Sequence, residues 1–529
     1  MSPPSAHRVV ARRVVLGALG LLVVVPASVS AAATSAQATS DASTSGPGAV
    51  QVDVDASSRV GTTIDQSLLG VDGPGPSSPV VDAAEAALGL HWVRTDVSFE
   101  SSYDCARWDP TSLDGRVQRI EDEGAKPLLI VDYTPPCLVP LPGAPPPGND
   151  SYEPPDVGTH QGTSDQVLWD GLVEQMAVHE IARGVCAFEV WNEPDGTFWY
   201  GGLPGYLHLY QDTATALEAA TRQAKQAGTD PCPSVEIGGP ALVFSDAAWI
   251  EPFLAFVAAE HLPLDFLSWH YYGDYPELGP VVDAGLLGTI PPSAPVPYWY
   301  NPALRAQTYA LQVQQVRAEV AAFPMLHPRL WIDEWNVDAG ADARMNGPYD
   351  AAFATAVLDA VQSAGLDRMT FFEVADAPPT TPPQEWGMLT DTGAPKPVYE
   401  AFLFWHRMAR DVVGVSLSPP QNAADPIGRI GAVAARGPSG RVTVLVYDFL
   451  PYDPTGTDGA AGAGPGGHRV EVRLTGLGGG RHRWVRALVD GAHPIGSVVG
   501  HGRVRGGEAT VAFPLAADGV TLLTFTTSS

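Results

Sequence analysis

Two short apolar stretches, Phe188–Asp195 and Leu330–Asn336, each carry residues whose types could do chemistry together. In the first, Glu193 follows a tryptophan and an asparagine, and in the second, Glu334 stands between an aspartate and a tryptophan. A glutamate at the end of a buried strand is costly unless its carboxylate has a function. Two such glutamates suit cleavage of a glycosidic bond, in which one carboxyl protonates the leaving oxygen and the other attacks the anomeric carbon. The alternative is that each is an ordinary strand-end residue that faces water.

The elements around these glutamates repeat as strand and helix. Eight short β-rich runs, most of them apolar on both faces, alternate with segments of helical periodicity. This alternation predicts an α/β fold, a (β/α)8 TIM barrel over residues 64–410, with the active site at the carboxyl ends of the strands. Glu193 and Glu334 then end the fourth and seventh strands. The expected strands are Ser67–Val71, His91–Thr95, Pro127–Tyr133, Ala187–Asn192, Ser234–Gly239, Asp265–Tyr271, Arg329–Trp335 and Met369–Val374, and the expected helices include Pro79–Leu88, Gly115–Glu123, Ser164–Arg183, Gly205–Ala227, Ala247–Glu260, Arg305–Ala322 and Tyr349–Ala364.

The chain changes character after about residue 410. Alternating apolar and polar runs separated by glycine-rich turns predict an antiparallel β-sandwich domain over residues 411–529. The runs are Arg441–Phe449, His468–Leu474, His482–Leu488 and Ala509–Phe513. An early alternating run, Val50–Ala56, lies within residues 50–63, which we expect to form an N-terminal strand that joins this sandwich.

The first 38 residues resemble a secretory signal peptide. Arg8, Arg12 and Arg13 precede the apolar run Val14–Ala27, which is too short to span a bilayer comfortably. Residues 39–49 are rich in small polar residues and predict a flexible linker. We therefore expect a secreted protein that has no membrane association after signal cleavage.

The charge balance restricts the partners. With 30 basic and 59 acidic side chains, the formal net charge is −29, which argues against nucleic acid as a partner. A strongly anionic sugar polymer is disfavoured for the same reason, although a local basic patch could override it. The sequence has no metal-ligand spacing and no phosphate-binding glycine loop, so we expect no cofactor and no metal.

Several motifs, in order, resemble those of clan A retaining glycoside hydrolases, and most closely those of family 39, which includes β-xylosidases and α-L-iduronidases. The resemblance covers roughly residues 64–410, and some likeness to family 51 arabinofuranosidases is also present. It implies that Glu334 is the nucleophile and Glu193 the general acid and later the base. The segments that carry it are Trp191–Asp195, Ile237–Ala241, Asp265–Gly273, Asp333–Asn336 and Gly387–Tyr399.

Further residues at the strand ends are candidates for holding a sugar. Asn192 could donate a hydrogen bond to a 2-hydroxyl group, or it could simply be a turn residue. His270 and Tyr272 share one face of the sixth strand and could fix the carboxylate of Glu334. Arg94 could lower the pKa of the nucleophile or form a structural ion pair. Weaker candidates for sugar contacts are Trp335, Asp376, Glu373 and Trp386, although tryptophan serves equally well as barrel filling.

The resemblance implies a retaining glycosidase that acts on oligosaccharides or polysaccharides. The second strand lacks the histidine and glycine of many xylosidases of the family, and the eighth does not end in paired glutamates, so the sugar stays open. The resemblance implies a β-xylosidase-like enzyme. We expect it to be exo-acting, because the long loops Thr134–His160 and Asp274–Ala303 would wall in the pocket; the alternative is that these loops cover the neighbouring helices. The alternatives are an arabinofuranosidase, an endo-acting exopolysaccharide hydrolase, and a carbohydrate-binding protein without catalysis.

The four cysteines of an exported chain favour two disulfides. Cys105 and Cys137 follow the second and third expected strands, whereas Cys186 and Cys232 precede the fourth and fifth. Pairing across the barrel would exceed the reach of a disulfide, about 7 Å between Cα atoms. The layout therefore predicts Cys105–Cys137 and Cys186–Cys232, with free buried thiols as the alternative.

Overall fold

The computed structural model describes residues 49–104, 107–139, 150–152, 154–155, 159–160, 163–273, 305–340, 342–377, 385–418, 430–449 and 467–528. The predicted signal peptide, nearly all of the predicted linker and most of the two long loops lie outside these ranges. Within them, no helix has the length and apolar character that crossing a membrane requires.

One sheet of parallel strands closes on itself, and the predicted TIM barrel is confirmed. Its order is β11-β10-β9-β8-β7-β4-β3-β2-β12. β11 pairs with β10 and β12 pairs with β2, while only Thr370 separates β11 from β12. These two short segments are thus halves of the eighth strand, which joins the first strand to the seventh. The strands are β2 (Gly70–Asp72), β3 (Trp92–Asp96), β4 (Lys126–Val131), β7 (Ala187–Val190), β8 (Glu236–Leu242), β9 (Phe266–Tyr272), β10 (Arg329–Asn336), β11 (Arg368–Met369) and β12 (Phe371–Phe372).

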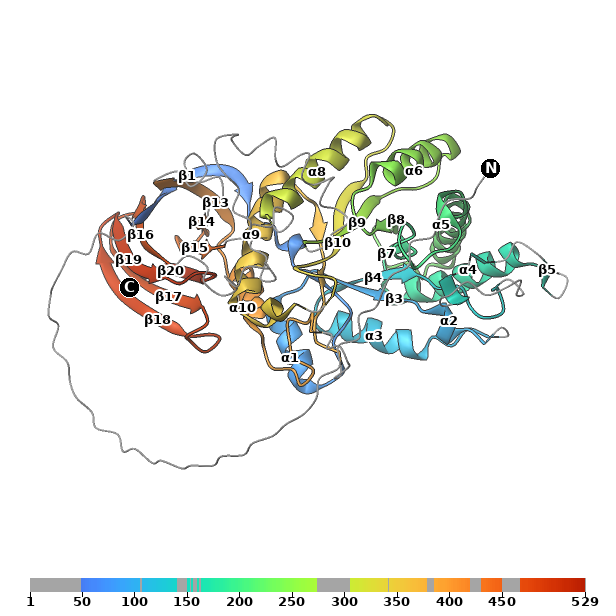
Figure 1. The fold of residues 1–529 in the computed structure, drawn as a ribbon, viewed down its shortest axis with the longest axis horizontal. Coiled ribbons are helices and arrows are strands. Elements are labelled where there is room, and N and C mark those ends of the chain that lie inside the picture. The colour runs from blue at the N-terminus through green and yellow to red at the C-terminus, as the bar shows by residue number, and fades with distance from the viewer. Residues whose placement is uncertain are drawn as a thin grey trace, which may run out of the picture. The chain divides into compact units, whose positions relative to one another are not determined.

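Helices surround this barrel because its strands are apolar on both faces; every residue of β9, for example, is buried. The first strand begins later than expected, because Asp65 caps a 3-10 turn, Gln66–Leu68, before β2. Figure 1 shows the helices outside the strands. They are α1 (Pro79–Leu88), α2 (Phe99–Ser102), α3 (Thr111–Asp122), α4 (Asp165–Arg183), α5 (Gly202–Ala227), α6 (Ala247–Glu260), α8 (Ala306–Ala321), α9 (Pro348–Ala364) and α10 (Pro397–His406), with short 3-10 turns at Asp150–Tyr152 and Ala343–Asn346 and a small hairpin of β5 (Thr159–His160) and β6 (Thr163–Ser164).

The C-terminal part forms one continuous sheet of order β18-β17-β20-β15-β14-β13-β1-β16-β19. Strand β1 (Val50–Thr63) lies among these C-terminal strands, blue beside orange and red in Figure 1. It pairs antiparallel with β13 but parallel with β16, so the sheet is mixed rather than purely antiparallel. Buried apolar side chains from the strands on both sides of β13 in this order pack together in one core. The other strands are β13 (Asp411–Ser418), β14 (Ile430–Arg436), β15 (Val442–Asp448), β16 (His468–Thr475), β17 (Arg481–Val489), β18 (Val498–Arg505), β19 (Ala509–Leu515) and β20 (Val520–Ser528).

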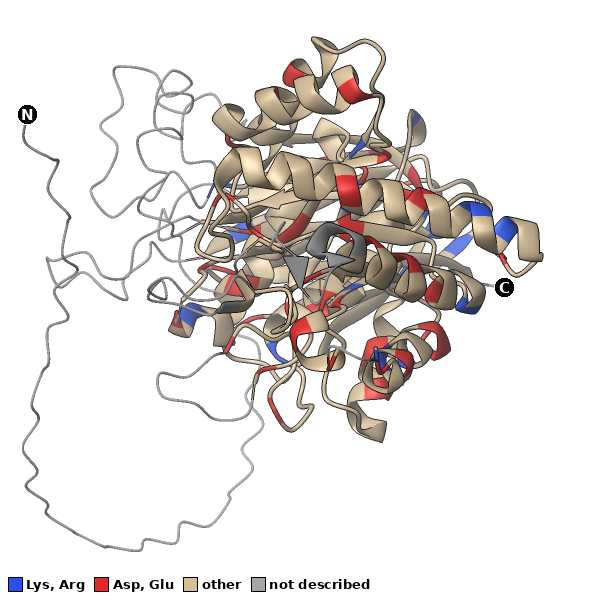
Figure 2. Cartoon of the chain, turned by 90° about the vertical axis from the view of Figure 1, so that its right-hand side faces the viewer, with Lys and Arg blue, Asp and Glu red and all other residues tan. Residues whose placement is uncertain are grey.

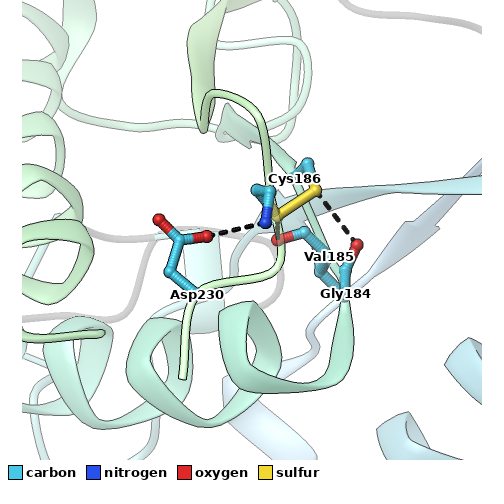
Figure 3. Close-up of a disulfide and its surroundings, with 5 residues drawn as sticks. Gly184, Val185, Cys186 and Asp230 are labelled. Atoms are coloured by element: carbon cyan, nitrogen blue, oxygen red, sulfur yellow. Dashed lines mark hydrogen bonds between the residues drawn. A yellow bond between two sulfur atoms is a disulfide. The ribbon is translucent and has the colours of Figure 1, made fainter. Parts of the chain in front are cut away.

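A disulfide joins Cys186 to Cys232, as predicted, with 5.6 Å between the Cα atoms (Figure 3). Cys186 directly precedes β7, and Cys232 precedes β8, so the bond ties two neighbouring strands at their amino ends. The backbone N–H of Cys232 donates to Asp230, which fixes the approach to β8. Cys137 is also disulfide-bonded, but its predicted partner, Cys105, lies outside the described residues.

Removing this bond should weaken the barrel without altering the strand ends that carry the carboxylates. Cys186→Ser with Cys232→Ser should lower the free energy of unfolding by about 3–4 kcal/mol, because the bond closes a loop of 46 residues in the unfolded chain. Urea denaturation of the oxidised proteins measures this difference. A double variant that unfolds at the wild-type midpoint would contradict the expectation.

Candidate functional site

The turn after β7 points Glu193 into the barrel by an unusual backbone path. Trp191 and Glu193 both have positive φ, 71° and 45°, a region that costs free energy for residues other than glycine. The backbone N–H of Glu193 donates to Ala241 O at 2.9 Å, and the indole N–H of Trp191 donates to Phe198 O at 2.9 Å. The backbone N–H of Val243 donates to Asp195. Packing and hydrogen bonds thus hold a strained turn that aims the carboxyl group of Glu193.

A register shift in β10 turns two consecutive carboxylates inward. Ile332 pairs with Trp269 of β9, but Glu334 pairs with His270, so Asp333 is an extra residue in the ladder. Side chains of a regular strand alternate between faces, whereas a bulge re-aims one of them. Both Asp333 and Glu334 consequently face Arg94, with N···O distances of 3.9 and 3.2 Å.

Arg94 of β3 is buried at the centre of this group of strand ends. Its Nη1 lies 2.5 Å from Asp72 Oδ2 and 3.2 Å from Glu334 Oε2, and its Nε donates to Glu189 at 2.7 Å. Burial disfavours the charged guanidinium, but the surrounding carboxylates outweigh it and hold the pKa of Arg94 above its ordinary value. Arg94 therefore forms a structural ion pair, the alternative considered for it, and its guanidinium group also lies beside Glu334.

His270 lies between the two predicted catalytic glutamates. Its Nδ1 is 2.9 Å from Glu193 Oε1 and 3.4 Å from Glu334 Oε2. The hydroxyl of Tyr272 donates to Glu334 Oε1 at 2.5 Å. Glu193, His270 and Glu334 each present an atom within 4.8 Å of the other two. Carboxyl groups this close suit a retaining mechanism, which uses a separation of about 5–5.5 Å, better than an inverting one, which uses about 6.5–9.5 Å.

Burial shifts the pKa values of Glu193 and His270 in opposite directions. It raises the pKa of Glu193 to about 7, against the opposing effect of Arg94. It also lowers the pKa of His270 to about 4, so this imidazole is neutral at neutral pH. A neutral imidazole can accept a hydrogen bond from protonated Glu193 or donate one to the ionised form. The arrangement suits a carboxyl that acts first as an acid and then as a base.

Below these groups, Asp333 and Glu189 form a buried carboxyl pair. Glu189 accepts from Arg94 and from Ser268, the latter at 2.6 Å. Burial opposes its ionisation, but Arg94 and hydrogen bonds from Asp333 and Ser268 lower its pKa. Burial and the charge of Glu189 raise the pKa of Asp333. A hydrogen bond between the two carboxyls requires one proton, and the raised pKa of Asp333 favours Asp333 as its carrier.

Asn192 is oriented by its neighbours. Its side-chain oxygen accepts from Arg94 Nη2 at 2.7 Å, so only the amide N–H groups remain to donate, and one lies 3.3 Å from Tyr133 Oη. This orientation leaves Asn192 a donor, as its predicted contact with a sugar hydroxyl requires. The sequence reading did not single out Tyr133.

Three of the weaker candidates for sugar contacts, Glu373, Asp376 and Trp386, follow β12 in the chain. Asp376 accepts from Lys396 at 2.6 Å and from the Gly387 backbone, and the half-buried Trp386 packs on Phe372 at 5.4 Å. Burial, followed by the charges of Asp376 and Glu334, raises the pKa of Glu373 to about 7.

Trp335 does not fit its predicted sugar contact. It is fully buried and packs against Phe371 and Phe402, with ring centroids 5.0 and 6.2 Å away. Because Trp335 directly follows the inward-facing Glu334, alternation turns its side chain outward into the layer between strands and helices. Trp335 is barrel filling, the alternative considered for it.

Three of the residues closest to Arg94 were missed by sequence reasoning: Asp72, Glu189 and Asp333. Their signal was present, since each is a charged residue inside an otherwise apolar strand. The atoms of Glu193, His270 and Glu334 could also face a metal ion. However, His270 and Arg94 already engage those carboxylate oxygens, which fits an acid–nucleophile pair better than a ligand set.

Two beta-xylosidases are similar in sequence to this chain. The chain is 27% identical over 255 residues to a beta-xylosidase from Geobacillus stearothermophilus, covering 46% of this chain and 45% of that protein. It is 23% identical over 305 residues to a beta-xylosidase from Caldicellulosiruptor saccharolyticus, covering 55% of each. The matches thus span about half the length of these relatives.

Solved structures share the fold at low identity. A monomeric beta-xylosidase from Caulobacter crescentus CB15 has a TM-score of 0.68 at 20% identity, covering 90% of this chain and 100% of that one. The GH39 enzyme from Xanthomonas axonopodis pv. citri has a TM-score of 0.66 at 19% identity, covering 90% and 97%. A family model, Glycosyl hydrolases family 39, matches residues 86–493. The chain therefore belongs to glycosyl hydrolases family 39.

Proposed function

We propose that this protein is a secreted, exo-acting retaining glycosidase that resembles β-xylosidases and acts on oligosaccharides from plant or microbial polysaccharides. The observation that carries the proposal is the approach of Glu193 and Glu334 around His270, with atoms of all three groups within 4.8 Å. Family membership and the beta-xylosidase relatives support the reaction class. The leader-like residues 1–38 support export.

In the first step, the carboxylate of Glu334 attacks the anomeric carbon while Glu193 gives its proton to the leaving oxygen. Arg94 and Tyr272 each hold one oxygen of Glu334, which orients the carboxylate for attack. The raised pKa of Glu193 keeps it protonated up to about neutral pH. The bond to the leaving group breaks as the covalent glycosyl-enzyme forms.

In the second step, water replaces the leaving group, and ionised Glu193 removes its proton as the bond to Glu334 breaks. His270 can serve both steps, because its neutral ring offers Glu193 an acceptor first and a donor afterwards. The two displacements together preserve the anomeric configuration of the sugar.

A panel of nitrophenyl glycosides tests the sugar, and NMR of the first-formed product tests the stereochemistry. We expect the β-xyloside to be cleaved at least about tenfold faster than the arabinofuranoside, a preference that one or two pocket contacts can supply. The first product should be the β-anomer. Initial formation of the α-anomer from a β-xyloside would refute retention, and no cleavage of any glycoside would favour a binding protein.

The two glutamates should respond differently to removal and to azide. Glu334→Ala should reduce kcat by several orders of magnitude, and azide should restore some turnover with a glycosyl azide of inverted configuration. Glu193→Ala should spare substrates with good leaving groups, because they need no proton, and azide should give the retained product. Product analysis by NMR measures both. Glu334→Ala with more than about a tenth of the wild-type rate would contradict the nucleophile assignment.

The pH profile should report Glu193. Activity requires its protonated form, so kcat/KM for an alkyl or phenyl glycoside should fall as the pH rises through about 7. A dinitrophenyl glycoside, which needs no proton, should lack this alkaline limb. Glu373→Gln is the control, because Glu373 also titrates near 7 but is not the proposed proton donor. If Glu373→Gln no longer showed the fall in kcat/KM at alkaline pH, that fall would have to be assigned to Glu373 instead of Glu193.

The proton on Asp333 predicts an asymmetric response to substitution. Asp333→Asn keeps a neutral hydrogen-bond donor for Glu189 and should retain kcat/KM within about threefold, whereas Asp333→Ala should lower the free energy of unfolding by about 1–3 kcal/mol. Thermal unfolding and steady-state kinetics measure the two effects. If Asp333→Asn were as damaging as Asp333→Ala, Asp333 would have to be ionised.

A further inference from the structure

An unusual cluster of arginines lies away from the active site, on one face of the hairpin β17–β18. Arg481 pairs with Arg505 across the two strands, and Arg483 pairs with Arg503. Residues directly opposite in an antiparallel ladder point to the same face, and so do residues two apart. All four side chains are exposed. The hairpin therefore presents four guanidinium groups side by side.

Two further arginines extend this cluster. On the other side of β17, Arg483 pairs with Thr526 of β20, and the next residue, Phe525, pairs with Val442. Arg441, directly before Val442, donates to the backbone oxygen of Arg407. Partial burial and the nearby charge of Arg407 lower the pKa of Arg441. We call Arg407, Arg441, Arg481, Arg483, Arg503 and Arg505 the basic patch.

The hairpin arginines of the basic patch lack partners. Among the described residues, none of the four side chains makes an ion pair or a hydrogen bond. Like charges directly opposite in a ladder destabilise it. Protecting the edge strand β18 from aggregation needs charges on β18 alone, yet Arg481 and Arg483 lie on β17, between β18 and β20. The four hairpin arginines therefore repel one another, and the stability of the fold does not explain their presence.

The basic patch is distant from the reaction. Arg407 follows α10, whose end packs on the approach to β2: the indole N–H of Trp405 donates to Asp65 O at 3.2 Å, and His406 contacts Gln66. These residues precede β2 and lie at the amino ends of the strands, opposite the carboxylates. A ligand on the patch would not occupy the catalytic pocket.

The basic patch contrasts with the charge of the chain as a whole. On the barrel side shown in Figure 2, which is away from the hairpin of β17 and β18, Asp and Glu are spread over many elements and Lys and Arg are fewer. The whole chain carries −29, yet six of its 30 basic residues gather in this patch. Arginine forks bind carboxylates in a bidentate manner.

We propose that the basic patch anchors a uronic-acid-bearing polysaccharide, which holds the enzyme on an acidic polymer while the barrel cleaves glycosidic bonds. This inference rests on the proposed function. Nucleic acid is the competing partner, but its dense charge, one per about 1.7 Å of duplex, meets the repulsion of the rest of the chain. A glycan with spaced carboxylates can contact the patch with less repulsion, and the hydroxyl of Thr526 can serve sugar hydroxyls.

Binding to immobilised polygalacturonate, measured by biolayer interferometry at several salt concentrations, tests the inference. Wild-type protein should bind, and binding should weaken steeply with salt. Arg483→Gln with Arg503→Gln should weaken it about tenfold or more, since two charge-assisted contacts are lost. Arg222→Gln with Lys225→Gln on the exposed surface of α5 removes the same charge and should change binding less than about twofold.

Two further measurements separate the alternatives. The patch variant should hydrolyse a small nitrophenyl glycoside at the wild-type rate and have an unchanged or higher Tm, because like-charge pairs are relieved. No binding by wild type, equal weakening by the α5 control, a lower Tm of the patch variant, or tighter binding of duplex DNA through the same arginines would overturn the inference. Lack of nitrophenyl glycosidase activity in wild type would instead refute the proposed function.

Discussion

The structure of the site depends on one buried positive charge. Arg94 is almost completely buried and contacts Asp72 of β2, Glu189 of β7 and Glu334 of β10, three carboxylates on three strands. It also fixes Asn192. Removing one partner from such a buried group costs about 3–5 kcal/mol, because the remaining charges lose their compensation. Arg94 thus couples closure of the barrel to the placement of Glu334 and of Asn192, the residue that precedes Glu193.

Because one arginine cannot balance every carboxyl around it, protons must make up the difference. Burial raises the pKa of Glu193 and of Asp333, while Arg94 and its hydrogen-bonding neighbours keep Glu189 ionised. In the proposed mechanism, the proton on Glu193 is the one given to the leaving oxygen, whereas the proton that the raised pKa of Asp333 favours takes no part in the reaction. The same shortage of positive charge therefore accounts for the raised pKa of Glu193 and for that of Asp333 in its buried pair with Glu189.

Local sequence patterns were sufficient for most of the elements and for the types of residue that gather at the candidate site. Helices α1 and α6 have the predicted bounds, because their apolar periodicity and their Ser78 and Asp246 caps agree. Non-local features were not accessible. The parallel pairing of β1 with β16 joins segments about 420 residues apart, and no local pattern encodes that register.

The candidate site shows the same difference between what local patterns predict and what depends on non-local structure. Glu193, Glu334, His270 and Tyr272 stand out as residue types at strand ends. Their spacing depends on the positive φ of Trp191 and on the bulge at Asp333, which alternation does not reveal. Trp335 was misjudged for a different reason: it directly follows the inward-facing Glu334, so plain alternation already turns its side chain away from the barrel interior.

The central claim is that Glu334 forms a covalent bond with the sugar. A 2-deoxy-2-fluoro glycoside with a good leaving group slows the second step, so the intermediate should accumulate and be detected by intact-mass and peptide mass spectrometry. The account predicts one added glycosyl group, located on the peptide that contains Glu334 and absent from Glu334→Ala. A glycosyl group attached to Glu193 would contradict it, and so would complete loss of activity without any added glycosyl group.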